Sequence, residues 1–412
     1  MLASLLPVRS LLTAIFVLMA GGGVLSTLTG VRLEESGSGT LQIGLAATAY
    51  FAGLTAGSLH VHRIIAGVGH IRAFTAFVSL FSASTLAYAL HLDPFLWSAL
   101  RFIDGLCIAG VFVCLESWLN ERAAPETRGI VLAGYMIVLY SGQALGQFLL
   151  GIGGAGSVLP FIAASILISL AAIPVALTRI AAPTMGADEP LALRRLYSIS
   201  PLGIAGATVT GLMMGAFYGL GAIYARRLGM DLAATATFMS VVIFGGVALQ
   251  WPLGRLSDTF DRRVVIVGTF GAAALTSGTL AFMTVPGAAL LAVGALFGGL
   301  VFALYPLCVA HTNDHLRPDE RVAASGGLVL FYSVGAAAGP IAGGGAMAFA
   351  DNALFLFLAA CAAGVLMFGL WRLRVAAPVP GAEQQAYQVL PRTTPMAAAL
   401  DPRGSETLKD AS

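Results

Sequence analysis

The sequence predicts an all-α membrane protein whose twelve transmembrane helices form two pseudo-symmetric six-helix bundles. Apolar residues occupy 58% of the 412 positions and charged residues only 10%, whereas soluble proteins contain about 25% charged residues. Apolar runs of roughly 20 residues, the length that crosses a bilayer, recur along the whole chain. The two halves also repeat one another, as shown below. This composition excludes an ordinary soluble domain.

The apolar runs and their charged or Gly/Pro breaks define the expected spans. In the first half they lie near 10–31, 41–61, 73–91, 95–119, 129–150 and 158–178. In the second half they lie near 201–222, 233–254, 264–284, 287–311, 323–346 and 352–371. The first run follows Arg9, as in a secretion signal, but eleven more follow, so we interpret it as a retained span.

These spans predict four regions of the chain. Residues 1–178 form an N-terminal six-helix bundle, and residues 201–374 form a C-terminal one. Residues 179–200 form a polar cytoplasmic linker between them. Residues 375–412 are rich in Pro, Gln, Ala and Ser, and this composition predicts a disordered cytoplasmic tail.

The basic residues predict the orientation. If the N-terminus is cytoplasmic, all but four of the 22 Lys and Arg residues fall in cytoplasmic segments. The exceptions are Arg32, Arg226 and Arg227 outside and Arg101 within a span. Cytoplasmic loops of membrane proteins carry the excess of Lys and Arg, so we expect both termini in the cytoplasm.

The internal repeat has an offset of 193 residues. Its most specific part is an Asn-acid pair followed by Pro-acid-x-Arg: Asn120-Glu121 and Pro125-Glu126-Thr127-Arg128 match Asn313-Asp314 and Pro318-Asp319-Glu320-Arg321. Glycines repeat with the same offset: Gly105, Gly142, Gly146 and Gly151 fall on Gly298, Gly335, Gly339 and Gly344. Two such halves, related by an axis along the membrane normal, suit a protein that rocks about a central site.

Loop motifs follow the second span of each half. The second half has Gly254-Arg-Leu-Ser-Asp258-Thr-Phe-Asp-Arg262-Arg263, with an aspartate and paired basic residues. The first half has Gly57-Ser-Leu-His-Val-His-Arg63 and then Gly69-His-Ile-Arg72, without the aspartate. We expect these eight residues to gate the cytoplasmic side, with Asp258 near Arg128. The alternative is simple positive-inside anchoring of the helix ends.

With these loops and the Arg101-x3-Gly105 motif, the chain resembles the major facilitator superfamily. Gly69-His-Ile-Arg72, Glu116-Ser-Trp-Leu-Asn120 and Leu304-Tyr-Pro306 resemble its YcaD-like bacterial branch. The resemblance implies the major facilitator fold, a bacterial inner-membrane location and secondary transport. It also implies a central path lined by spans 1, 4, 7 and 10, with spans 2, 5, 8 and 11 as its walls.

Three charges lie inside the spans, all on the fourth: Arg101, Asp104 and Glu116. Each costs about 2.5 kcal/mol or more in the membrane unless it is paired or hydrated. Arg101 and Asp104 share a helical face, so they form either a structural ion pair or a switch linked to protons or substrate. The second half has Gly294 and Phe297 at the matching positions, which favours a specialised role.

Glu116 lies about 22 Å further along the same helix, near the expected cytoplasmic face. It either pairs with Arg122 or Arg72 at the interface or relays protons. The residues themselves leave both interpretations open.

Polar groups on otherwise apolar spans predict a cavity. Tyr140, Gln143 and Gln147 share one helical face of the fifth span, and Tyr305 and Tyr332 stand on the tenth and eleventh. These residues either line the cavity or form hydrogen bonds between helices. A cavity of this kind is aromatic and weakly charged, which argues against a multiply charged substrate.

We therefore expect a proton-coupled transporter, an exporter of a small amphipathic molecule, with an uncoupled facilitator as the alternative. A membrane-embedded enzyme or sensor is a remote alternative. The expected partners are the substrate, the lipid bilayer and protons. We expect a monomer that binds no cofactor and no nucleic acid. We also expect no metal site, because His311 and His315 at a helix end do not form a metal motif.

Overall fold

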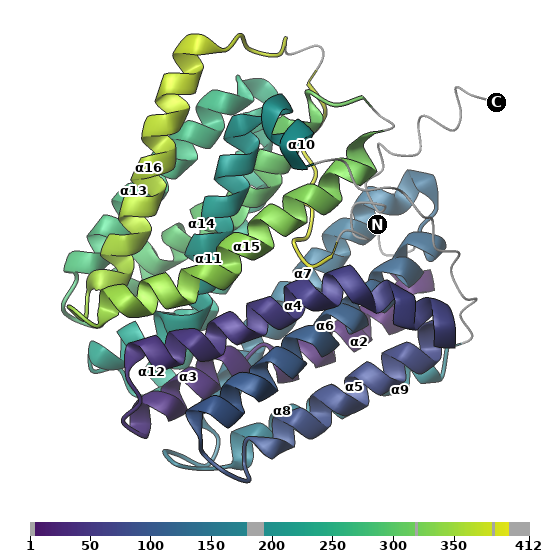
Figure 1. The fold of residues 1–412 in the computed structure, drawn as a ribbon, viewed down its shortest axis with the longest axis vertical. Coiled ribbons are helices and arrows are strands. Elements are labelled where there is room, and N and C mark those ends of the chain that lie inside the picture. The colour runs from purple at the N-terminus through teal and green to yellow at the C-terminus, as the bar shows by residue number, and fades with distance from the viewer. Residues whose placement is uncertain (1–4, 179–192, 318–319, 381–383, 395–412) are drawn as a thin grey trace.

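The structure is a computed structural model that describes residues 5–178, 193–317, 320–380 and 384–394. Every regular element within these residues is a helix, in agreement with the predicted all-α fold. Helices of the first half, purple to blue, and of the second half, teal to yellow, gather in two groups (Figure 1).

The first group follows the six expected spans closely. Its elements are η1 (Leu6–Val8), α2 (Arg9–Gly22), α3 (Leu25–Glu35), α4 (Thr40–Val68), α5 (His70–Ala87), α6 (Pro94–Arg122), η2 (Pro125–Thr127), α7 (Arg128–Gly146), η3 (Gln147–Gly151), α8 (Leu159–Leu170) and α9 (Ala172–Ala176). The first span is broken into α2 and α3 at residues 23–24. The fifth and sixth spans also consist of two helical pieces each, α7 with η3 and α8 with α9.

The second group has one long helix for each expected span. After the short α10 (Leu193–Ile199) come α11 (Pro201–Arg227), α12 (Leu232–Thr259), α13 (Arg262–Phe282), α14 (Ala288–Asn313), α15 (Arg321–Met347) and α16 (Ala353–Val375). The predicted linker thus ends in a helix, and its residues 179–192 lie outside the described part.

Ten stretches of the described chain are long and apolar enough to cross a membrane by length and composition alone. The more polar helices α4 and α5 occupy the two remaining expected spans. A count of twelve spans is consistent with this result. Most helices extend a few residues beyond the predicted apolar runs, because a helix continues into polar sequence as long as its backbone hydrogen bonds are made.

Glycine contacts repeat between the halves as the 193-residue offset predicts. A Cβ on Gly105 of α6 would overlap the backbone oxygen of Tyr50 on α4, and a Cβ on Gly298 of α14 would overlap that of Val242 on α12. Without side chains at these glycines the helix backbones can approach closely. The same packing solution therefore serves corresponding helix pairs in both halves.

Candidate functional site

A cavity of about 120 Å³ lies between the two groups of helices. Residues of α2–α7 in the first half and of α11 and α15 in the second line it. Most of the lining is apolar or aromatic, and its polar members are Ser26, Tyr50, Tyr140, Gln143, Tyr218, Tyr332, Arg392 and Thr393. Such a surface suits a small ligand with a large apolar part.

The segment 384–394 runs back between the two groups of helices (Figure 1). Its residues Pro391, Arg392 and Thr393 line the cavity. The Cζ atom of Arg392 lies 4.6 Å from the ring centroid of Phe302, 5.6 Å from that of Tyr332 and 5.8 Å from that of Tyr140. The prediction of disorder over 375–412 is wrong for this segment. Composition could not reveal its position, because side chains of distant helices hold it in an irregular conformation.

Glu116 lies beside this segment, fully buried. The hydroxyl of Tyr135 donates to its Oε1 at 2.7 Å, and the hydroxyls of Thr393 and Thr394 donate to Oε1 and Oε2. From the sequence, Arg122 or Arg72 was named as a partner of Glu116, and no signal indicated the two threonines.

Arg101 and Asp104 form the expected ion pair on α6, with Nη1 and Oδ2 3.6 Å apart and both side chains buried. The hydroxyl of Tyr88 donates to the same Asp104 oxygen at 2.6 Å. Arg101 also donates to Ser26 at 2.5 Å and lies 4.3 Å from the ring centroid of Tyr50. Ser26 and Tyr50 line the cavity, so the ion pair stands directly behind its wall.

The polar stripe of the fifth span, on α7 and η3, contains residues of both kinds that the sequence allowed: some line the cavity and one forms hydrogen bonds between helices. Tyr140 and Gln143 line the cavity, and the hydroxyl of Tyr218 donates to Gln143 at 3.3 Å. Gln147 is buried between helices, where it accepts from Thr27 at 2.8 Å and donates to the backbone oxygen of Gly23 at 3.0 Å. It therefore joins the fifth span to the first.

Tyr305 and Tyr332 lie together, with ring centroids 5.1 Å apart. Tyr332 lines the cavity, and Tyr305 packs behind it. The tenth span instead contributes Phe302 to the rings around Arg392.

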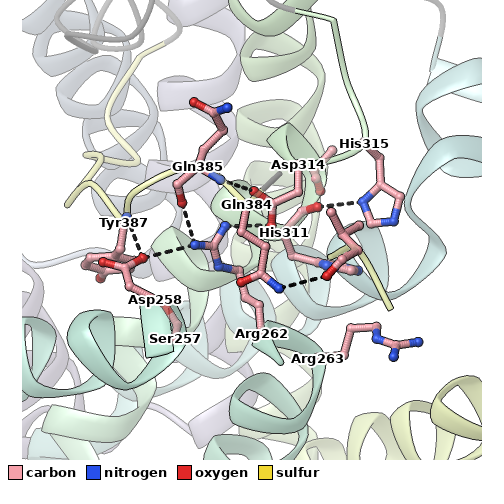
Figure 2. A network of polar contacts seen from close by, with 12 residues as sticks. Ser257, Asp258, Arg262, Arg263, His311, Asp314, His315, Gln384, Gln385 and Tyr387 are labelled. Atoms are coloured by element: carbon pink, nitrogen blue, oxygen red, sulfur yellow. Dashed lines mark hydrogen bonds and ion pairs between the residues drawn. The ribbon is translucent and has the colours of Figure 1, made fainter. Parts of the chain in front are cut away.

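The motif of the second half forms a polar network with the segment 384–394 (Figure 2). Arg262 donates to Asp314 at 2.6 Å, to Asp258 at 3.1 Å and to the backbone oxygen of Gln385 at 2.6 Å. The backbone N–H groups of Gln385 and Tyr387 donate to Asp314 and Asp258 at 2.9 and 2.8 Å. Burial raises the pKa of Asp314, and the Arg262 guanidinium opposes that rise.

The other residues of this motif complete the network. The ring of Tyr387 covers Gly254. Arg263 pairs with Asp261 at 2.7 Å and donates to the backbone oxygen of Ala376 at 2.7 Å. Asp258 was expected near Arg128, whereas the structure pairs it with Arg262 and Tyr387.

The motif of the first half has a different structure from the predicted loop. Gly57 and Arg63 lie within α4, which continues to Val68, and Gly57 packs against Ala109 of α6. Only Gly69 interrupts the helices, with φ of +86°, a conformation that residues with a Cβ rarely adopt. Arg63 and Arg72 are exposed. In this half, Gly57 therefore forms a helix–helix contact and Gly69 a tight turn.

The two halves also meet directly at the opposite end of the molecule from Asp258. Arg227 of α11 pairs with Glu34 of α3 at 2.9 Å and with Asp351 at 2.7 Å. Beside it, the hydroxyl of Thr40 on α4 donates to the backbone oxygen of Gly344 on α15 at 2.8 Å. These contacts close this end of the interface between the halves.

The sequence did not predict several residues of the site: Ser26, Tyr50, Tyr88, Tyr135, Tyr218, Phe302, Arg392, Thr393 and Thr394. A tyrosine in an apolar span carries no signal that separates a cavity from a helix contact. The threonines and Arg392 stand in a segment without periodicity. The only usable signal was the isolated positive charge at position 392.

The chain matches the family model of the Major Facilitator Superfamily over residues 11–305 and 206–402. It is 31% identical over 359 residues to an uncharacterized MFS-type transporter, YcaD, of Salmonella typhimurium, covering 86% of this chain and 92% of the relative. It is also 31% identical over 373 residues to an uncharacterized MFS-type transporter of Yersinia pestis, covering 88% and 94%.

Two solved structures show the same fold at low identity. The nucleoside transporter NupG superimposes with a TM-score of 0.75 at 12% identity, covering 90% of this chain and 99% of NupG. A bacterial homologue of the human lysosomal transporter Spinster, in an inward-facing and occupied conformation, superimposes with a TM-score of 0.65 at 15% identity, covering 92% and 97%.

Proposed function

The chain belongs to the major facilitator superfamily, and from that premise we propose that it is a proton-coupled exporter of a small amphipathic molecule. It works by alternating access in the bacterial inner membrane, with both termini in the cytoplasm. The lining of the cavity supports the substrate class, because apolar and aromatic side chains dominate it.

The position of the Arg101–Asp104 pair is the observation that carries the proposal of proton coupling. Arg101 holds Ser26 and Tyr50, two residues of the cavity wall, while its charge is balanced by Asp104. A proton on Asp104 removes that balance and changes the interaction of Arg101 with the wall. Substrate and proton therefore act on the same small group of side chains.

An uncoupled facilitator is the second candidate, and the same geometry provides its support. Asp104 and Tyr88 enclose Arg101 in a buried cluster that also serves as a static helix contact. The two candidates differ in one measurable property, the response of transport to a pH gradient.

Transport by purified protein in proteoliposomes tests the proposal. A compound that raises the melting temperature of the protein in a metabolite screen serves as the transported probe. Coupling predicts that this compound accumulates against its own concentration gradient only when a pH gradient is imposed. Equal accumulation ratios with and without the gradient would establish the facilitator instead.

Single-cysteine labelling in a cysteine-free background tests the orientation. Ser36, Met230 and Asp351 are expected outside, and Ala66, Pro125, Pro190 and Pro318 are expected in the cytoplasm. In intact cells a membrane-impermeant maleimide labels cysteines at the exposed positions 36 and 351 and spares the second group, whereas position 230 is buried and reacts slowly. Labelling at position 125 from the periplasm would contradict the orientation.

A further inference from the structure

A guanidinium group in the middle of an apolar cavity calls for an explanation. Arg392 comes from the chain's own tail, and its Cζ atom faces the rings of Phe302, Tyr332 and Tyr140 at 4.6, 5.6 and 5.8 Å. Phe302 and Tyr332 belong to the second half and Tyr140 to the first. These three rings, hereafter the aromatic box, attract a cation through their electron-rich faces.

The charges around the aromatic box also favour a cation. Arg101 and Asp104 neutralise one another. Glu116 accepts hydrogen bonds from Tyr135, Thr393 and Thr394, the last two directly after Arg392 in the chain. Without the tail, no basic side chain remains among the cavity-lining residues.

We propose that the aromatic box is the recognition site for an organic cation, a guanidinium or ammonium group on an apolar body, and that Arg392 occupies it as an intramolecular competitor. This inference rests on the proposed function and names its substrate class. The cation of the ligand takes the place of the guanidinium, and its apolar body contacts the apolar wall of the cavity.

The tail is held by contacts that can be broken and remade. Gln385 and Tyr387 dock on Asp314 and Asp258 through backbone N–H groups, and Leu390 is buried. Beyond them, Arg392 and the two threonines make contacts that a ligand and water can replace. A ligand must therefore bind tightly enough to displace the tail before it can occupy the cavity.

Equilibrium binding of radiolabelled benzylguanidine to the purified full-length protein in detergent tests this inference. Unlabelled benzylurea, which has nearly the same shape but no charge, is the control for displacement of the bound benzylguanidine. Arg392→Ala should bind benzylguanidine at least tenfold more tightly than the unaltered protein, because the competitor is gone. Arg374→Ala, which removes an exposed arginine at the end of α16, should bind it as the unaltered protein does.

Two further variants separate the aromatic box from a general effect of the tail. Phe302→Leu in the Arg392→Ala background removes a ring at similar volume and should reverse the gain. Thr393→Val with Thr394→Val keeps Arg392 but weakens its anchor, and should give a smaller gain. This second variant also tests the inference if Arg392→Ala fails to fold.

Unchanged affinity in the folded Arg392→Ala or double-threonine protein would overturn the inference, as would equal displacement by benzylurea. The assay has no membrane and no gradient, so such a failure leaves proton-coupled transport standing. Conversely, tight binding of benzylguanidine without gradient-driven uptake would count against coupling and leave the cation site intact.

Discussion

At the scale of single residues, Asp104 is connected to the cavity wall through Arg101. Its carboxylate balances Arg101, which holds Ser26 and Tyr50 in the wall, and it accepts from Tyr88. Removing one member of a buried ion pair costs about 3–5 kcal/mol, because the other charge remains buried without compensation. A protonation change at Asp104 therefore requires the surroundings of Arg101 to rearrange.

Asp104→Asn tests whether that rearrangement drives transport. The amide imitates the protonated acid, so the carrier should still exchange substrate across the membrane but should lose gradient-driven accumulation. Substrate exchange and gradient-driven accumulation are both measured in proteoliposomes, with the compound that raised the melting temperature in the metabolite screen. If the pair is only structural, Asp104→Asn should express poorly, and Arg101→Gln in addition should restore expression. Normal accumulation by a well-expressed Asp104→Asn protein would contradict both accounts.

The sequence predicted the pairing of Arg101 with Asp104 but not the contacts of Glu116 with the tail. Arg101 and Asp104 were expected as a pair because a spacing of three places them on one helical face. The contacts of Glu116 were not, since Thr393 and Thr394 stand 277 and 278 positions away from it. Local spacing fixes neighbours along one helix, whereas contacts between distant segments depend on the whole packing.

At the scale of helices, apolar length predicted where each span lies, and the internal repeat predicted that glycines recur at matching positions of the two halves. Gly105 and Gly298 serve matching helix pairs, as the internal repeat implies. The predicted loop from Gly57 to Arg63 was wrong, because polar residues at a membrane surface do not end a helix. Only Gly69, with its positive φ, does so.

Gly298→Ala tests the close helix packing. The added methyl group overlaps the backbone oxygen of Val242, which cannot rotate away, and overpacking of this kind costs about 1–3 kcal/mol. The apparent melting temperature of the purified protein should therefore fall by several degrees. Gly268→Ala is the matched control, since a Cβ there meets no atom within 4 Å. Equal melting temperatures for the two variants would show that α12 and α14 can separate at little cost.

At the scale of the whole molecule, the two halves are joined by different means at the two ends. Arg227 of the second half links them through Glu34 of the first half at one end. At the other, the segment 384–394 extends from the Asp258–Arg262–Asp314 network of the second half to Glu116 of the first. Alternating access requires the contacts at the Arg227 end to open, and exchange of the tail for a ligand removes one connection at the other.

A reversible cross-link at the Arg227 end tests this movement. Glu34→Cys with Arg227→Cys, made in a background without the four native cysteines, is joined by a short reducible reagent that reacts with both thiols. Cross-linking should abolish substrate exchange in proteoliposomes, because the halves can no longer separate there, and reduction should restore it. Ser82→Cys with Ser165→Cys is the control: their hydroxyl oxygens are 2.7 Å apart within one half, so a disulfide there should leave exchange unchanged. If the cross-linked Glu34–Arg227 variant still exchanged substrate at the uncross-linked rate, rocking of the two halves would not be the transport movement.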